Sequence, residues 1–541
     1  MTHTVTTAPQ LRSCYEVVVV GGGSAGAAVA GRLSERGVQV CLLEAGEDWR
    51  SAALPDSLRH PFKQFELHVD ELPSQFLWAG QRARRFAGGP PTEYLRGRGL
   101  GGTSTINGCF AIRPPLEEFD DWAAAGCKGW GAADVLPYFN RLENDVDFGD
   151  ADYHGDAGPV PIVRMPRQFW GTVDQAVAQA AVASGLDWVP DYHEPGRTGA
   201  SASAYNLGLG VRVTSNDGYL EPARQRSNLT IQGGALVDQV LVDHGRAVGV
   251  RALIGDEVHD IGADHVVLCG GTLLTPGVLL RSGIGPAEDL ATLGRDVVAD
   301  LPVGRRIQDH VGYEFGLVLD HGVGSLSGQR GNVTIRQTTG LGGAGDVIMT
   351  TVNVPQTGAP VGGLLCKVAE CFSRGRLTVT DTDPRALPDV ELDLLGDERD
   401  LAALRAMFRQ AVPMLTAAIG ETPLRAVLGM DGGELPAVDD DAAVDAWIRG
   451  HAHDTAHVSC SAPMGGADDE HAVVDTDLRV RGVDGLSVAD LSVAPTIPRA
   501  NTHLSAVMIG ERAADLVTGA RPSVEAGEPV DAADAGGART C

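Results

Sequence analysis

The stretch "YEVVVVGGGSAGAAVAGRLSERGVQVCLLEAG", Tyr15–Gly46, decides the fold of this 541-residue chain. It reads as a short β-branched run, a glycine turn, an alanine-rich segment and a second apolar run, an order that predicts strand, helix and strand. Gly21, Gly23 and Gly26 form a G-x-G-x-x-G pattern where the first strand meets the helix. The sequence therefore predicts an α/β fold that contains a βαβ unit.

The glycine turn also predicts a dinucleotide site. Glycines permit the tight turn and let a pyrophosphate approach the backbone at the N-terminus of the helix. Glu44 closes the second strand, where a carboxylate can accept hydrogen bonds from ribose hydroxyls. These features do not separate FAD from NAD, and a purely structural glycine turn is the alternative interpretation.

Composition excludes several classes of partner. The formal net charge is −28, which argues against nucleic acid and anionic membranes. The N-terminus has no charged region followed by an apolar run, and no apolar run is long enough to span a bilayer. Nine cysteines are scattered without a CxxC pair, which is typical of reduced thiols. We therefore expect a cytoplasmic protein without a transmembrane segment.

Later segments indicate how the chain is organised. "NLTIQGGALVDQVLVDHGRAVGVRAL" (228–253) predicts a β-meander, and "DERDLAALRAMFRQAVPMLTAA" (397–418) predicts an amphipathic helix. Residues 263–285 and 485–517 return to a strand, a loop and a helix, as in the first unit. We expect the nucleotide domain to combine residues 14–165, 200–310 and 453–519. Residues 166–199 and 311–452 then form a second domain, and residues 1–13 and 520–541 are expected to be disordered.

Four motifs resemble signatures of the glucose–methanol–choline (GMC) oxidoreductases. They are "GRGLGGTSTINGCFAIRPPLEEFD" (97–120), "GTLLTPGVLLRSGIG" (271–285), "HVSCSAPMG" (457–465) and "NTHLSAVMIGERAADL" (501–516). The resemblance extends from about residue 14 to residue 518. The segment "NDVDFGDADYHGDAGPVPI" (144–162) is most similar to the branch of hydroxymethylfurfural oxidase, pyridoxine 4-oxidase and mycofactocin-associated dehydrogenases.

The resemblance implies a Rossmann-like FAD-binding domain and a discontinuous substrate domain built on an antiparallel sheet flanked by helices. The first domain would hold FAD through Gly21, Gly23, Gly26, Glu44, Gly101, Gly102, Asn107, Val237 and Asp490. Val237 matches the position beside adenine, and Asp490 one near the phosphates. Ile106 stands where some relatives carry the histidine that binds FAD covalently, so we expect non-covalent FAD.

The resemblance also implies that the enzyme oxidises a small alcohol to an aldehyde by hydride transfer to flavin N5. His457 matches the active-site histidine of the family, and a histidine suits a base because its pKa lies near neutral pH. We place His503 as its partner across the flavin, at the N-terminus of the last helix. Asn501 can either contact substrate or cap that helix, and we favour the cap.

Several alternatives remain open at this stage. The electron acceptor is O₂ in an oxidase, and a quinone or another redox carrier in a dehydrogenase. His451, His453 and His457 also raise the possibility of a zinc hydrolase, although we expect no metal, and a non-catalytic flavin-binding protein is a further alternative. Cys460 and Ser461 replace the usual Gly-Thr after the histidine, and Cys109 is expected to be a small buried hydrophobe.

Overall fold

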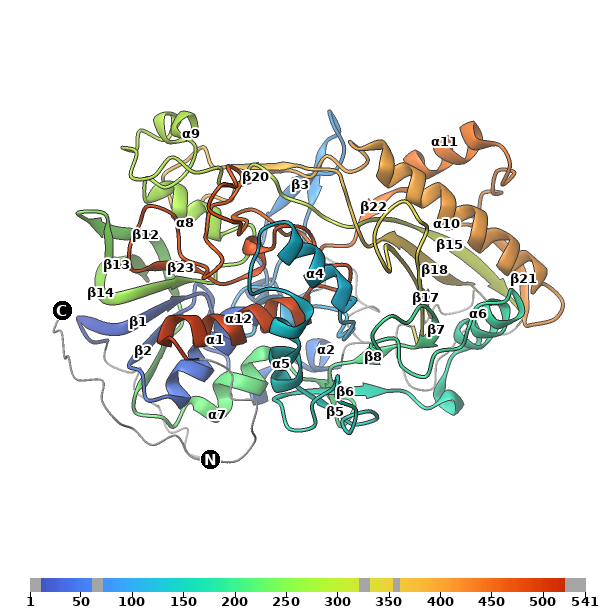
Figure 1. Ribbon diagram of the computed structural model, residues 1–541, viewed down its shortest axis with the longest axis horizontal. Helices are drawn as coiled ribbons and strands as arrows, with labels where there is room; N and C mark the ends of the chain where they lie inside the picture. The colour runs from blue at the N-terminus through green and yellow to red at the C-terminus, as the bar shows by residue number, and fades with distance from the viewer. Residues whose placement is uncertain (1–10, 61–71, 321–330, 354–360, 521–541) are drawn as a thin grey trace.

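The computed structural model describes residues 11–60, 72–320, 331–353 and 361–520. Within these ranges the chain forms two large sheets that lie side by side, with helices on their outer faces (Figure 1). The predictions of disorder at the two termini fall mainly outside the described residues. No helix in the described ranges is long and apolar enough to cross a membrane.

The first sheet is built around the predicted βαβ unit. Its strand order is β11 (Leu229–Gln232), β2 (Val40–Leu43), β1 (Cys14–Val20), β14 (Glu257–Leu268), β13 (Arg246–Ile254) and β12 (Ala235–Asp243), and β23 (Leu486–Val488) pairs with β14. β1 is parallel to both β2 and β14. The predicted meander is confirmed for β12 and β13. It is wrong for β11, which pairs in parallel with β2 at the edge of the sheet, because alternation alone does not determine which strand is the partner.

Helices from both ends of the chain cover one face of this sheet. α1 (Ser24–Glu35) packs against α12 (His503–Thr518), and α5 (Ala132–Leu142) lies beside α12. The approach of α1 to α12 is close, since a Cβ atom on Gly510 would come within 2.4 Å of the Ala25 carbonyl oxygen. The C-terminal segment therefore returns to the first sheet, as the sequence predicts.

The second sheet is antiparallel throughout. Its order is β21 (Leu424–Gly429), β15 (Val311–Leu319), β18 (Val361–Val368), β17 (Val347–Val352), β16 (Val333–Gln337) and β7 (Gly199–Ala202), with β22 (His453–Asp454) also paired to β15. α6 (Thr172–Ala183), α10 (Glu398–Ala417) and α11 (Asp441–His451) lie on its outer side (Figure 1). The predicted helix at 397–418 is confirmed as α10, whose first turn is capped by the Asp397 side chain.

Successive residues along the strands of the second sheet face two different environments. Tyr313 and Phe315 point toward the outer helices and pack against Phe408 and Trp447. Residues of the opposite parity, such as Glu314 and Lys367, line a cavity between the two sheets. The sheet thus separates a hydrophobic core from the cavity, and places charged side chains on the cavity side.

Smaller elements connect the two halves. β3 (Arg82–Arg84) and β4 (Pro91–Glu93) form a sheet with β19 (Arg376–Thr378) and β20 (Asp389–Glu391). The remaining principal elements are α4 (Leu116–Ala124), β5 (Glu143–Asp145), β6 (Val160–Arg164), β8 (Ala204–Tyr205), α8 (Thr275–Arg281) and α9 (Ala287–Thr292). By strand pairing, β7 and β22 belong to the second sheet, a few residues across the expected domain boundaries.

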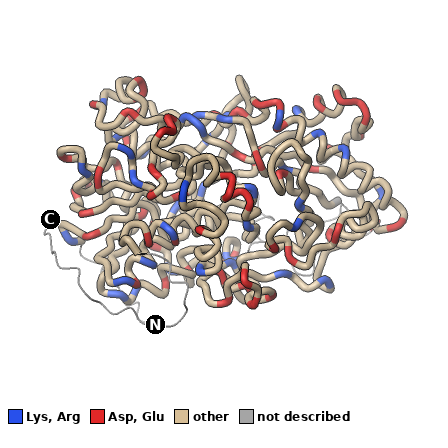
Figure 2. The backbone as a smooth tube through the Cα atoms, in the orientation of Figure 1, with Lys and Arg blue, Asp and Glu red and all other residues tan. Residues whose placement is uncertain are grey.

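Charges and cysteines complete the description. Acidic and basic positions are spread over the whole chain rather than gathered in one segment (Figure 2). Among the described residues, seven cysteines are free and buried, which agrees with the prediction of reduced thiols at these positions.

Candidate active site

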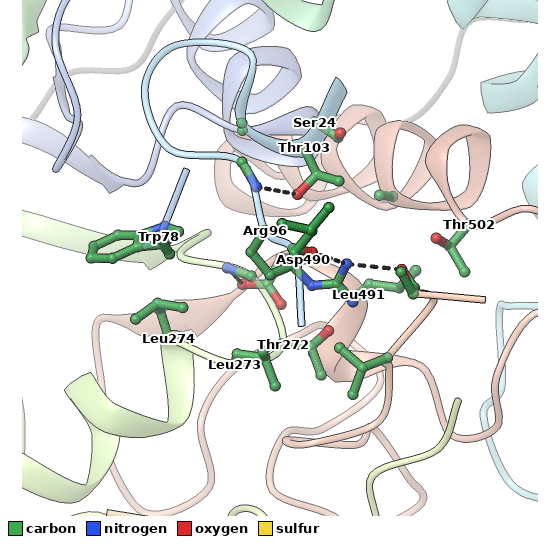
Figure 3. A pocket seen from close by; sticks show the side chains of 18 of the residues that line it. Ser24, Trp78, Arg96, Thr103, Thr272, Leu273, Leu274, Asp490, Leu491 and Thr502 are labelled. Carbon is green, nitrogen blue, oxygen red and sulfur yellow. Dashed lines mark hydrogen bonds between the residues drawn. The ribbon is translucent and has the colours of Figure 1, made fainter. Parts of the chain in front are cut away.

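A cavity of about 620 Å³ lies between the two sheets. Its walls come from the glycine turn, residues 95–110, residues 269–281, the second sheet and the C-terminal segment. Figure 3 shows side chains from these segments, among them Ser24, Thr103, Thr272 and Asp490, arranged around one space. The cavity therefore combines residues that are hundreds of positions apart in the sequence.

The glycine turn leaves a cradle with no room for side chains. A Cβ atom on Gly21 would lie 2.5 Å from the Cys269 carbonyl oxygen, and one on Gly102 would lie 2.7 Å from the Gly23 Cα atom. Gly21 and Gly102 also have positive φ angles, which favour glycine. Because both segments expose backbone at the cavity and Gly23 precedes the first turn of α1, they fit the pyrophosphate of a dinucleotide.

Three other predicted cofactor residues line the same cavity. Glu44 is 6% exposed, and its two carboxylate oxygens accept hydrogen bonds from the backbone N–H groups of Gly22, Gly46 and Gly99. A carboxylate has further lone pairs, so ribose hydroxyls can still donate to it. Val237 and Asp490 also line the cavity, and Asp490 accepts a hydrogen bond from Gly271 N at 2.9 Å.

The remaining three predicted cofactor residues divide into two kinds. Asn107 lines the cavity, and its Oδ1 accepts from Arg212 at 2.7 Å. Gly26 and Gly101 do not line it. Gly26 lets α1 pack on β1, and the N–H of Gly101 donates to the Gly22 carbonyl at 2.8 Å. Gly26 and Gly101 therefore support the cradle from the side that faces away from the cavity.

His457 lies in the cavity wall and is held from several sides. Its backbone N–H donates to Asp309 Oδ1 at 2.8 Å, and the Asp309 carboxylate also accepts from the Tyr94 hydroxyl. Arg96 donates to the preceding carbonyl, that of Ala456, at 2.8 Å (Figure 3). Burial first, and then the positive charge of Lys367, hold the pKa of His457 well below its usual value. The imidazole is therefore neutral at pH 7, as a proton acceptor must be.

His310 determines which nitrogen of His457 carries the proton. His310 Nε2 lies 3.0 Å from the Ala369 carbonyl oxygen, which can only accept, so Nε2 carries the hydrogen. Burial lowers the pKa of His310, so its ring is neutral and its Nδ1 is an acceptor. His457 Nδ1 lies 3.0 Å from that atom and 2.8 Å from the Thr455 hydroxyl, and a hydrogen on Nδ1 gives the His310 acceptor its donor, with the Thr455 oxygen as a second acceptor. Nε2 of His457 is left without a hydrogen, ready to accept a proton.

The structure places His503 in the cavity wall at the start of α12 and gives Asn501 a different role from the one that the sequence suggests. His503 lines the cavity, but its Nδ1 lies 3.1 Å from the Ser24 hydroxyl, beside the glycine turn, and it has no hydrogen bond to His457 among the described contacts. Burial lowers its pKa to about 4. The interpretation of Asn501 as a helix cap is wrong: Thr502 is the N-cap residue, and Asn501 Oδ1 accepts from Lys367 Nζ at 2.9 Å.

The three histidines of a zinc site do not converge. His451 ends α11, stacks on Trp447 and bonds to its carbonyl, and His453 Nδ1 bonds to the Asp454 carbonyl. His457 bonds instead to His310 and Thr455. Each histidine therefore has its own neighbours, and the cluster in the sequence is not a ligand set in the fold.

The unusual residues after His457 have structural explanations. Cys460 is buried with φ +71°, a conformation that favours glycine, and its thiol donates to Gln308 Oε1. Ser461 donates to the Thr272 carbonyl at 2.7 Å. Cys109 is buried among Tyr205 and Leu207, which agrees with its interpretation as a small hydrophobe.

Sequence reasoning missed His310, Asp309 and Lys367. The first two stand in "QDHV" (308–311), directly before β15, and a carboxylate–histidine pair at a predicted domain boundary is the available signal. Lys367 sits in an otherwise apolar strand, and that exception is a second signal. Together the dinucleotide cradle and a neutral, oriented histidine define a dinucleotide-dependent oxidoreductase.

Comparison with known proteins names the family. A model of the GMC oxidoreductases matches residues 15–312, and its C-terminal counterpart matches residues 371–510. The chain is 36% identical over 530 residues to 5-(hydroxymethyl)furfural oxidase from Methylovorus sp. (strain MP688), covering 93% of this chain and 98% of that protein. It is 31% identical over 557 residues to the oxygen-dependent choline dehydrogenase of Photobacterium profundum, covering 95% of this chain and 94% of that protein.

A solved structure agrees with this result. Pyridoxine 4-oxidase from Mesorbium loti superposes with a TM-score of 0.84 at 26% identity, covering 92% of this chain and 98% of that one. The chain belongs to the GMC oxidoreductase family. It is an FAD-dependent enzyme that acts on alcohol groups.

Proposed function

We propose that this enzyme oxidises a primary alcohol to an aldehyde, with O₂ as the electron acceptor and FAD bound non-covalently. The neutral His457, whose Nε2 is free to accept a proton inside a cavity that also contains the dinucleotide cradle, is the observation that carries the proposal. Relatives named for oxidation of a hydroxymethyl group and of pyridoxine support the substrate class.

Each predicted group has a defined task in this proposal. The Gly21–Gly23 turn, Gly102 and Glu44 hold FAD, which supplies the hydride acceptor when it is bound. His457 Nε2 accepts the hydroxyl proton, and His310 keeps the ring in the required tautomer. The cavity walls exclude water and orient the alcohol carbon. His503 is hydrogen-bonded to Ser24 and is the first residue of α12. In this proposal the dipole of that helix stabilises negative charge at its N-terminus.

Anaerobic flavin reduction tests the proposal directly. A panel of primary alcohols is mixed with the FAD-loaded enzyme without oxygen, and the flavin absorbance is followed. We expect at least one alcohol to bleach the flavin, and His457→Ala to slow bleaching by about 100-fold or more, the usual contribution of a base. If no alcohol bleaches the flavin, or if His457→Ala bleaches at the wild-type rate, the proposal is wrong.

The acceptor needs a separate measurement. The fully reduced enzyme is mixed with air-saturated buffer in one arm and with an anaerobic quinone in the other. An oxidase regains its flavin absorbance in air and releases H₂O₂ in equal amount to aldehyde. Slow reoxidation in air with rapid reoxidation by quinone would assign the enzyme as a dehydrogenase.

A further inference from the structure

Lys367 is a buried cation in the wall of the active-site cavity. It lies in β18, on the cavity side of the second sheet, and is 3% exposed. Its Nζ donates to Asn501 Oδ1, in the segment that leads into α12. A lysine is rarely buried to this degree without a charged partner, because removing an ammonium group from water is costly.

The hydrogen bonding of Lys367 is incomplete. An ammonium group has three donors, and among the described residues only one acceptor, Asn501 Oδ1, lies within hydrogen-bond distance. No carboxylate in the described ranges lies within ion-pair distance of Nζ, although the chain forms ion pairs at many other places. Two of the three donor positions of the protonated amine are therefore left without a described partner at the cavity wall.

The nearest acidic residues on the sheet do not neutralise this charge. Glu314 lies on the same face, but its carboxylate lies over Gly363, where a Cβ atom would come within 2.3 Å of Oε1. Gly363 is four residues from Lys367, about 13 Å along the strand. Asp454 is paired with Arg85. Beside His457, Lys367 and Arg96 supply positive charge, and the buried Asp309 carboxylate is the nearby acid, which accepts from the Tyr94 hydroxyl and from the backbone N–H of His457.

We propose that Lys367 binds a carboxylate of the substrate, so that the preferred substrates are alcohols that also carry a carboxylate group. Two oxygens of a carboxylate match the two remaining donors of the ammonium group, and a negative charge replaces the missing counter-ion. Burial lowers the pKa of Lys367 to about 7, and a bound carboxylate would raise it and keep the group charged. This inference rests on the proposed oxidation of alcohols at the same site.

Matched substrates test the inference. The meta and para isomers of (hydroxymethyl)benzoate are compared with the corresponding amides, which have the same shape and no charge. We expect wild-type kcat/KM to favour a carboxylate over its amide, and Lys367→Met to reduce that ratio about 100-fold, the cost of removing one partner of a buried charge pair. Lys367→Arg should restore most of the ratio. Lys128→Met, which changes an exposed lysine, should leave it as in the wild type.

A binding measurement separates this inference from the proposed function. Benzoate, which has no alcohol, is titrated into the oxidised holoenzyme and its Kd is read from the change in the flavin spectrum. Weaker benzoate binding in Lys367→Met supports the carboxylate site even if no alcohol reduces the flavin. Equal Kd values in the two proteins overturn the inference. So does an equal loss of rate on acid and amide together with a changed flavin potential, which would assign Lys367 to the flavin.

Discussion

At the scale of single residues, Cys460 has a left-handed backbone close to the site, as do Cys109 and Ala456. Its φ of +71° places an L side chain in the left-handed region, which costs about 1–2 kcal/mol compared with glycine. Backbone hydrogen bonds of the segment that follows His457, including Cys460 N to Leu491 O at 3.2 Å, hold it there. The cysteine is therefore strained in a place where the signature of the family has glycine.

Two substitutions isolate this strain. Cys460→Gly and Cys460→Ala both remove the thiol, but only glycine relaxes the left-handed conformation. We expect the Gly variant to be more stable than the Ala variant by about 1 kcal/mol in urea unfolding of the holoenzyme. Cys366, buried in β18 with an ordinary φ, is the matched control, and there the order should reverse, by about 0.5–1 kcal/mol. The same order at both positions would contradict the interpretation.

At the scale of elements, the contact of α1 with β1 sets the position of the dinucleotide cradle. A Cβ atom on Gly26 would lie 1.9 Å from the Gly21 carbonyl oxygen and 2.9 Å from the Cys269 Cβ atom. Both neighbours directly follow the strands that carry the cradle. The helix cannot make room for a methyl group without moving the turn that faces the cofactor.

Gly26→Ala should therefore weaken both folding and FAD binding. We expect a loss of about 1–3 kcal/mol in unfolding free energy, as for other overpacked positions, together with release of FAD at lower temperature than in the wild type. Gly450→Ala is the control, because Gly450 lies in α11 with nothing within 4 Å of its Cβ position. That change should stabilise by up to about 1 kcal/mol. Wild-type FAD retention in Gly26→Ala would disprove this account of the helix contact.

The sequence predicts elements well where the signal is local. The glycine turn, α10 and the return of the C-terminal segment to the first sheet follow from periodicity and turn residues within short windows. The position of β11 cannot be predicted in this way, because its alternation is the same for a meander and for a parallel edge. Pairing partners are decided by the whole sheet, which a short window does not contain.

The site is less predictable for the same reason. His310 is 147 positions from His457, and only the packing of β15 against the C-terminal segment brings the two rings together. The assignments of Asn501 and His503 depend on where α12 begins, since two residues near a helix start point in different directions. The role proposed for Lys367 depends on the lack of a counter-ion among the described residues, and only the fold shows which residues surround its side chain.

At the scale of the whole molecule, a buried ionic network joins segments that the sequence assigns to different domains. His154 lies between Glu143 and Asp191, with 2.7 Å from each ring nitrogen to a carboxylate oxygen. Arg113 pairs with Glu143 at 2.5 Å, and Arg164 pairs with Asp191 at 2.8 Å. The segment 144–162, which carries the resemblance to one branch of the family, therefore contributes to the joint between domains.

The network also explains a cluster with the appearance of a metal site. Asp145, His154 and His193 bring their potential ligand atoms within 4.8 Å of one another. Both ring nitrogens of His154, however, face carboxylates and donate to them, so the ring has no lone pair to offer a metal ion. The group is better described as an imidazolium held by two acids.

Because of this arrangement, the contribution of His154 to the free energy of unfolding decreases as the pH rises. Burial alone would lower the pKa of His154, but the hydrogen bonds to Asp191 and Glu143 outweigh it and raise the pKa above its usual value. The unfolded chain therefore loses this proton first as the pH rises. The stabilisation is complete below about pH 6.5 and declines above it by up to about 1.4 kcal/mol per pH unit, until the folded pKa is reached.

His154→Gln tests this dependence. Below about pH 6 the variant should be less stable than the wild type by about 1.5–3 kcal/mol, because Glu143 and Asp191 each lose a charged hydrogen bond but keep their arginine partners. The difference should narrow as the pH rises from about 6.5 to 9, since only the wild type loses the contribution of the proton. Unfolding free energies measured across this range provide the comparison. His471→Gln, at an exposed histidine, should follow the wild type throughout. A gap between His154→Gln and the wild type that stays constant with pH would show that the buried ring is neutral.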